Sequence, residues 1–224
     1  RHPVHNPPFP FSQMTLRNPS FFLLPLLLLP SVAPAQDAIQ LLDFARRSIA
    51  SMNGTFDGSL ILGSGRKRVP FVLETAPNGA MRYHFNKPDE ILSVVIGRRP
   101  SGALGRIVRG TDITMEDLSM WYLTWPAGKI RNESSAGMSF FVVPVKNVHN
   151  IGSYSRADVW IHQKSMGLFR VDAFDQNDNL LRRMDVEHIR SFGPQKIADR
   201  LRVSTYKRDR KVSSTYVQLV KERP

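Results

Sequence analysis

Ten short runs of β-branched and aromatic residues constrain the fold of this chain more than any other feature of its sequence. Four lie between residues 55 and 97 and six between residues 138 and 221, and turn-forming residues such as Pro77-Asn78-Gly79 separate them. Apolar side chains alternate along the runs, which is typical of strands with one buried face. In the first three runs that face holds Phe56, Leu60 and Leu62, then Val69, Phe71 and Leu73, then Met81, Tyr83 and Phe85. The pattern predicts an antiparallel meander.

Residues 37–54 have a different period and predict an amphipathic helix. Its apolar residues recur every three or four positions, and Asn53-Gly54 would end it. The expected buried face consists of Ile39, Leu42, Ala45, Ile49 and Met52.

The stretch RGTDITMEDLSMWYLTWP, residues 109–126, predicts a second helix that interrupts the meander. Thr114 is suited to the N-cap, Asp117 completes a capping box, and Glu116 complements the positive end of the helix dipole. One helix that ends before Pro126 would place three apolar side chains on a single face, namely Leu118, Trp121 and Tyr122.

These elements predict a mainly β (α+β) protein. About ten strands and two helices favour a large, curved antiparallel sheet, open or nearly closed, with the helices on its concave face. Residues 36–224 suffice for a single domain with its own core.

The N-terminal residues are expected to direct export. Residues 14–35 resemble a signal peptide, with a basic start, an apolar run too short to span a bilayer and a small-x-small motif that predicts cleavage near Ala35. Residues 1–13 precede the plausible initiator Met14 and are interpreted as a mis-assigned upstream extension.

The composition of the chain restricts the partners that it can bind and the chemistry that its side chains can perform. The chain has no cysteine, which excludes disulfides, thiol catalysis and thiolate metal sites. Residues 36–224 contain 29 basic and 19 acidic residues, a net charge near +10. This charge favours anionic partners such as acidic head groups, cell-wall polymers or acidic proteins, although it could serve solubility alone. Because the chain is expected to be exported, nucleic acid is the least expected partner.

No motif in the sequence supports a reactive centre. The four histidines after residue 36 lack a metal-ligand spacing. Residues 175–186 begin like a calcium loop, but Leu180 and Val186 replace the required Gly and Glu, so a hairpin turn is favoured. Ser64-Gly-Arg-Lys67 matches S-x-x-K without its partner motifs. We therefore expect no catalytic residue, no metal, no cofactor and no enzymatic activity.

A basic run near the C-terminus allows two interpretations. Lys207, Arg208, Arg210 and Lys211 could contact phosphates or a membrane face. An exposed turn between the last two strands, where like charges discourage edge pairing, explains the same residues without a ligand.

Three segments together resemble one bacterial family. The stretch 109–126, the run ADVWIHQKSMGLFRVDAFDQNDNLLRRMDV and the closing SSTYVQLV are similar to the LolA-like, outer-membrane lipoprotein-sorting proteins, in particular a less characterised branch. The resemblance covers nearly all of residues 37–222. It implies an unclosed β half-barrel capped by helices, a periplasmic location, and acyl chains held in an apolar hollow. His162 departs from the acidic residue that the family often has after its Trp-Ile pair.

The resemblance implies that the aromatic stretch, residues 109–126, is part of a candidate lipid site. Its side chains would meet the inner face of the strands, either as a closed core or as a cavity for lipoprotein acyl chains or lipid. The candidate residues are Leu60, Leu62, Phe71, Leu73, Tyr83, Phe85, Val94, Ile96, Leu118, Trp121, Tyr122 and Trp125.

Two functions remain open from the sequence. A carrier or sensor of lipidated partners would work with inner- and outer-membrane sorting components and could touch a membrane peripherally. The alternative is a non-catalytic envelope module that binds a protein or an acidic cell-wall polymer, with the hollow filled by its own side chains.

Overall fold

The computed structural model describes residues 34–63, 65 and 67–223, and their side chains from residue 37 onward. The expected upstream extension, residues 1–13, and nearly all of the expected signal peptide, residues 14–35, lie outside this part. Helix α1 (Pro34–Ala50) begins beside the expected cleavage site near Ala35, which stays a prediction.

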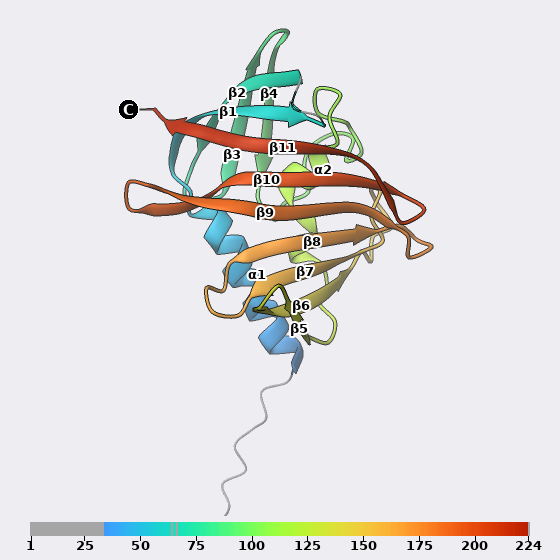
Figure 1. The fold of residues 1–224 in the computed structure, drawn as a ribbon. Coiled ribbons are helices and arrows are strands. Elements are labelled where there is room, and N and C mark those ends of the chain that lie inside the picture. Colours follow the sequence, from blue (N-terminus) through green and yellow to red (C-terminus); the bar gives the residue numbers. More distant parts are fainter. Residues whose placement is uncertain (1–33, 64, 66, 224) are drawn as a thin grey trace, which may run out of the picture. The chain divides into compact units, whose positions relative to one another are not determined.

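The described residues form one antiparallel sheet of eleven strands (Figure 1). Its order is β4-β3-β2-β1-β11-β10-β9-β8-β7-β6-β5, so β4 and β5 are the two unpaired edges and the half-barrel is unclosed. The strands are β1 (Gly54–Leu62), β2 (Lys67–Thr75), β3 (Ala80–Asn86), β4 (Asp89–Val95), β5 (Arg131–Ser135), β6 (Met138–Lys146), β7 (Arg156–His162), β8 (Leu168–Phe174), β9 (Leu180–Phe192), β10 (Gln195–Lys207) and β11 (Arg210–Glu222).

Ten of these strands confirm the ten predicted runs, and β5 was missed. Four of its five residues are exposed. Its sequence, Arg-Asn-Glu-Ser-Ser, has no apolar alternation, because an edge strand can exist through backbone pairing with β6 alone. Periodicity cannot detect such a strand.

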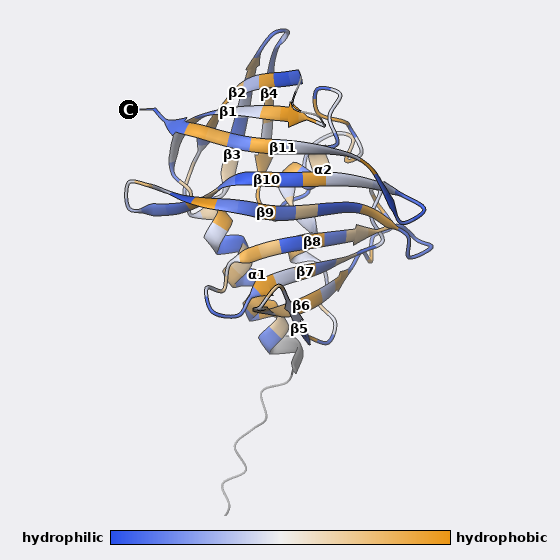
Figure 2. Ribbon diagram, viewed as in Figure 1, coloured by the Kyte–Doolittle hydropathy of each residue, from blue (hydrophilic) through white to orange (hydrophobic). Residues whose placement is uncertain are grey.

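The first and last strands pair and join the two halves of the sheet. Leu60 of β1 lies opposite Val217 of β11, with their side chains on the concave face. The other side of the sheet carries ion pairs: Asp185 accepts hydrogen bonds from Arg170 and Arg202, its cross-strand neighbours, at 2.9 Å each. Hydrophilic and hydrophobic positions accordingly succeed one another along β9 and β10 (Figure 2).

Helix α1 packs against the concave side, where it contacts β6, β7 and β8. The helix buries Ala38, Leu41, Leu42 and Ala45, whereas Ile39 is 62% exposed. The predicted face was therefore wrong at Ile39. Two alanines on the true face allow a close approach to the strands, and a face built on Ile39 would not contain Ala38 or Leu41.

The second helix is split into two pieces. Helix α2 (Met115–Ser119) has the predicted capping box, in which Thr114 and Asp117 exchange hydrogen bonds. Met120 then takes a left-handed conformation with φ of 47°, and the 3-10 helix η1 (Trp121–Thr124) follows. The prediction of one continuous helix was wrong because the left-handed residue changes the chain direction before Trp121.

None of the helices in the described residues is sufficiently long and apolar to cross a membrane.

The buried ring of Phe71 makes Gly58 of β1 sensitive to substitution. A Cβ atom at Gly58 would lie 2.4 Å from Cζ of Phe71, whose ring is buried. We expect Gly58→Ala to lower the free energy of unfolding by about 1–3 kcal/mol, because the ring must move within a packed core. Denaturant titration measures the loss. In a Phe71→Leu background the same substitution should cost less, and an equal cost would show that the ring is not the obstacle.

Candidate functional site

A cavity of about 320 Å³ lies between the helices and the concave face of the sheet. Its sheet side is formed by residues of β2, β3, β8, β9, β10 and β11, and its helix side by the end of α1 and by α2. The sheet residues include Met184, Val186, Leu201, Val203, Val217 and Leu219. Alternation along the strands explains the wall, because every second side chain of β9 to β11 points into the half-barrel.

Methionine is prominent in this wall. Met52, Met81, Met120 and Met184 line the cavity, which is half of the eight methionines in the chain. Methionine has three rotatable bonds and a polarisable sulfur, so such a wall adapts to ligands of variable shape.

The few polar groups at the inner end of the cavity are paired. Asp117 accepts hydrogen bonds from the hydroxyl of Tyr154 at 2.7 Å and from the amide and hydroxyl of Thr114 at 2.8 Å each. The hydroxyl of Tyr83 lies 3.7 Å from the sulfur of Met81. Burial raises the pKa of the Asp117 carboxyl, partly offset by these hydrogen bonds. An apolar group entering the cavity would leave these pairs intact.

The rim of the cavity is different in character. Ser48 of α1, Ser165 of the β7–β8 turn, and Ile189 and Lys196 of the β9–β10 hairpin line the cavity and are exposed. The rim therefore combines an exposed apolar side chain with an ammonium group.

Behind the cavity, Glu116 is fully buried on α2. Its Oε2 accepts a hydrogen bond from the amide of Ser153 at 3.0 Å, and Oε1 has no partner among the described residues. Burial, with a smaller contribution from the nearby Asp117, raises the pKa of Glu116 to about 7. The sequence suggested only a complement to the helix dipole, because its burial depends on the loop around Gly152, which packs over it.

The twelve candidate residues divide between the cavity and the core. Leu73, Tyr83, Ile96 and Leu118 line the cavity. Leu60, Phe71, Phe85, Val94, Trp121, Tyr122 and Trp125 belong to the buried core, and Leu62 is half-buried near the end of β1. Contact of any of the twelve with a lipid stays a prediction.

The aromatic stretch is packed against itself. The rings of Trp121 and Trp125 meet edge to face at 5.4 Å, and Tyr122 meets Trp125 in the same way at 6.3 Å. His149 stacks on Trp121 at 6.1 Å. The cluster thus forms one wall of the core beside the cavity, rather than its lining.

Sequence reasoning missed the lining residues of β9, β10 and β11. Apolar alternation in these strands was a usable signal, since Met184 and Val186, or Leu201 and Val203, are two positions apart. The sequence does not predict that β9 to β11 lie beside β1 and β2 in the half-barrel, because this arrangement depends on the pairing of β1 with β11.

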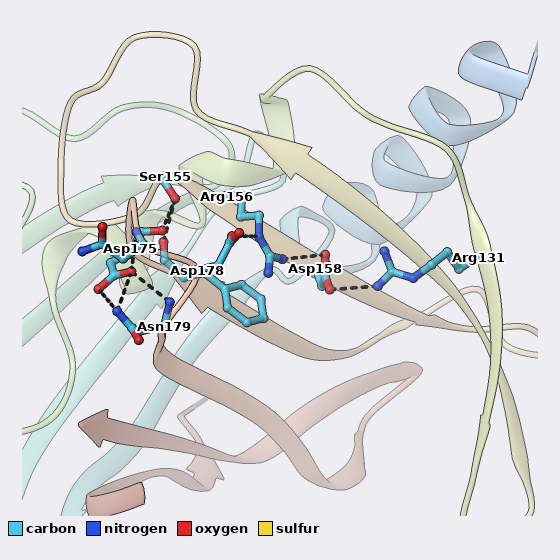
Figure 3. A network of polar contacts seen from close by, with 9 residues as sticks. Arg131, Ser155, Arg156, Asp158, Asp175, Asp178 and Asn179 are labelled. Atoms are coloured by element: carbon cyan, nitrogen blue, oxygen red, sulfur yellow. Dashed lines mark hydrogen bonds and ion pairs between the residues drawn. The ribbon is translucent and has the colours of Figure 1, made fainter. Parts of the chain in front are cut away.

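Asp175 and Asn179 form a structural turn (Figure 3), as the sequence indicated. The Asp175 carboxylate accepts hydrogen bonds from the amides of Asn177 at 2.8 Å and Asn179 at 2.9 Å. Nearby, Asp158 is held by Arg131 at 2.8 Å and Arg156 at 3.4 Å. Across the described part of the chain, no three His, Asp or Glu side chains are grouped so that they could hold a metal ion.

The sequence of the chain matches the model of one known protein family. A family model described as "Uncharacterized protein" matches residues 96–222, more than half of the 224 residues. The chain belongs to this family. A comparison with curated proteins gave no match.

Solved structures show that the fold is LolA-like. An outer membrane lipoprotein-sorting protein domain from Vibrio parahaemolyticus has a TM-score of 0.62 at 14% identity, covering 83% of this chain and 92% of that one. A LolA superfamily protein from Nitrosomonas europaea has a TM-score of 0.61 at 11% identity, with 84% and 92% covered. A DUF1329 family protein from Desulfovibrio piger ATCC 29098 has a TM-score of 0.59 at 12% identity, with 85% and 92% covered. At these identities the likeness concerns the fold.

The buried Glu116 should make stability depend on pH. The folded chain keeps this proton up to about pH 7, whereas the unfolded chain loses it near pH 4.5, the usual pKa of a glutamate side chain. The contribution of Glu116 to stability is therefore greatest below pH 4.5 and falls as the pH rises to 7, by about 3 kcal/mol. Glu116→Gln removes this dependence, and denaturant titrations from pH 4 to 8 measure the difference between the two proteins.

The control for that series is Glu133→Gln on the exposed strand β5. It should keep the pH dependence of the unsubstituted protein. A Glu116→Gln protein whose stability follows the same pH curve as the unsubstituted one would contradict the assignment.

Proposed function

We propose that this chain is an exported, periplasmic protein that binds acyl chains of lipids or lipoproteins in its apolar cavity, as a carrier or sensor in outer-membrane lipoprotein sorting. The observation that carries the proposal is the cavity itself, an apolar space between helices and sheet. Each methylene moved from water into such a space contributes about 0.8 kcal/mol. Binding without a covalent bond is therefore sufficient to hold a lipid tail.

Three further observations support the proposal. The wall of the cavity is rich in adaptable methionine, its inner polar groups are already paired, and a cationic rim lies at its entrance. The fold is that of a domain whose name refers to outer membrane lipoprotein sorting, and of a LolA superfamily protein. The expected signal peptide of residues 14–35 agrees with a periplasmic location. We propose binding and not catalysis as the function, because the lining of the cavity is mostly apolar.

A direct test is native mass spectrometry of the purified protein after expression with export. We expect a bound mass that is lost on organic extraction and whose fragments identify an acylated molecule. Val186→Phe and Ala198→Phe, which place rings in the cavity, should reduce the bound fraction at least tenfold, because each displaced methylene removes about 0.8 kcal/mol. Val212→Phe on the exposed part of β11 should retain the unsubstituted level.

The same experiment distinguishes lipid binding from the alternative function, that of a non-catalytic envelope module. A protein that is purified without ligand and takes up no added lipopeptide would contradict lipid binding. Salt-sensitive binding to an acidic cell-wall polymer would then favour the envelope module, with the basic turn Lys207, Arg208, Arg210 and Lys211 as its first candidate contact.

A further inference from the structure

The size of the cavity restricts what it can hold. An apolar cavity of about 150 Å³ in another protein binds one benzene molecule, which has six carbon atoms. On the same scale, a cavity of about 320 Å³ holds roughly twelve carbon atoms. This capacity matches one acyl chain of medium length, and two or three chains of a multiply acylated lipid would require the core to open.

The rim supplies the chemistry for the head of such a molecule. Lys196 is exposed at the cavity edge. The neighbouring carboxylate, Asp199, is fully buried and engaged by His188 at 2.6 Å and Arg190 at 3.1 Å, and among the described residues Lys196 takes part in no ion pair. Its ammonium group is therefore available to an anion at the entrance.

The backbone around Lys196 is held in place. The side chain of Gln195 accepts a hydrogen bond from the amide of Asn53 at 3.1 Å and donates one to the carbonyl of Asn53 at 2.9 Å. These bonds fasten the β9–β10 hairpin to the short segment between α1 and β1. On the other side, the pairing of β9 with β10 is irregular between Ile197 and Arg200, and Ile189, 57% exposed, lies at this irregularity. The rim is thus a fixed structure with an apolar and a cationic component.

We propose that the cavity selects anionic amphiphiles with a single acyl chain, the chain lying along the inner wall and the head group meeting Lys196 at the rim. This inference rests on the proposed function and narrows its ligand class. A fatty acid and a single-chain lipid with a phosphate both carry an anionic head group, and the ammonium group of the rim recognises this charge. Ile189 covers the first methylenes of the chain where they leave the cavity.

The test uses straight-chain fatty acids of 8 to 18 carbons and the alcohols of the same lengths, titrated into delipidated protein by calorimetry. Affinity should rise about fourfold per methylene, up to chains of roughly ten to twelve carbons, and then stay level, because later methylenes remain in water. Acids should bind more tightly than alcohols of the same length. Lysophosphatidylglycerol should behave as the acids do, which tests the phosphate head.

Substitutions at two lysines separate the head-group contact from general charge. Lys196→Met keeps the apolar stem of the side chain. It should lower the affinity for fatty acids by roughly threefold to fivefold and leave the affinity for alcohols unchanged. The difference should disappear in 1 M salt. Lys211→Met should change neither series, because this exposed lysine of β11 lies opposite Tyr206, roughly 33 Å along β10 from Lys196.

The outcomes distinguish this inference from the proposed function. Affinity that keeps rising to 18 carbons, or tighter binding of a triacylated lipopeptide than of any single chain, would overturn the single-chain class while leaving lipid binding in place. Equal loss for acids and alcohols in Lys196→Met would overturn the head-group contact. Failure of every acylated probe would overturn the proposed function itself.

Discussion

Three buried or half-buried carboxylates between residues 112 and 117 hold the structure around the cavity together. Asp112 accepts hydrogen bonds from hydroxyls of β10 and β11, including Thr215 at 2.9 Å, while Glu116 and Asp117 accept from the loop before β7. One short segment is thus fastened both to the sheet, at β10 and β11, and to the loop before β7. Because the aromatic residues follow this segment directly, the same bonds decide where the aromatic wall lies.

The hydrogen bonds of this segment divide the hydrophobic interior into a rigid part and an adaptable part. The aromatic rings next to α2 pack on one another, and η1 contacts α1, β6 and β7, so that part of the interior is closed. The aliphatic and methionine side chains of β9 to β11 leave space under the end of α1. The outer face of β8 to β10 is covered by paired charges such as Arg170, Asp185 and Arg202, which keep that side in water.

The sequence predicts local structure well and long-range pairing poorly, and both results have a physical cause. Alternation and turn residues located ten strands, and Thr114 with Asp117 gave the helix cap, because these signals are local. The left-handed Met120 and the polar strand β5 carry no such signal. The lining residues of β9 to β11 were missed for the same reason: their place in the cavity depends on the pairing of β1 with β11, which sets Val217 opposite Leu60.

The methionine content of the cavity wall has a chemical consequence. A thioether is converted to a sulfoxide by mild oxidants, and the product is polar and larger. Sulfoxidation of Met52, the half-buried member of the four, would place a strong dipole in the apolar wall near the end of α1. An occupied cavity shields its sulfur atoms from such oxidants, so occupancy and chemical lifetime of this protein are linked through the same four side chains.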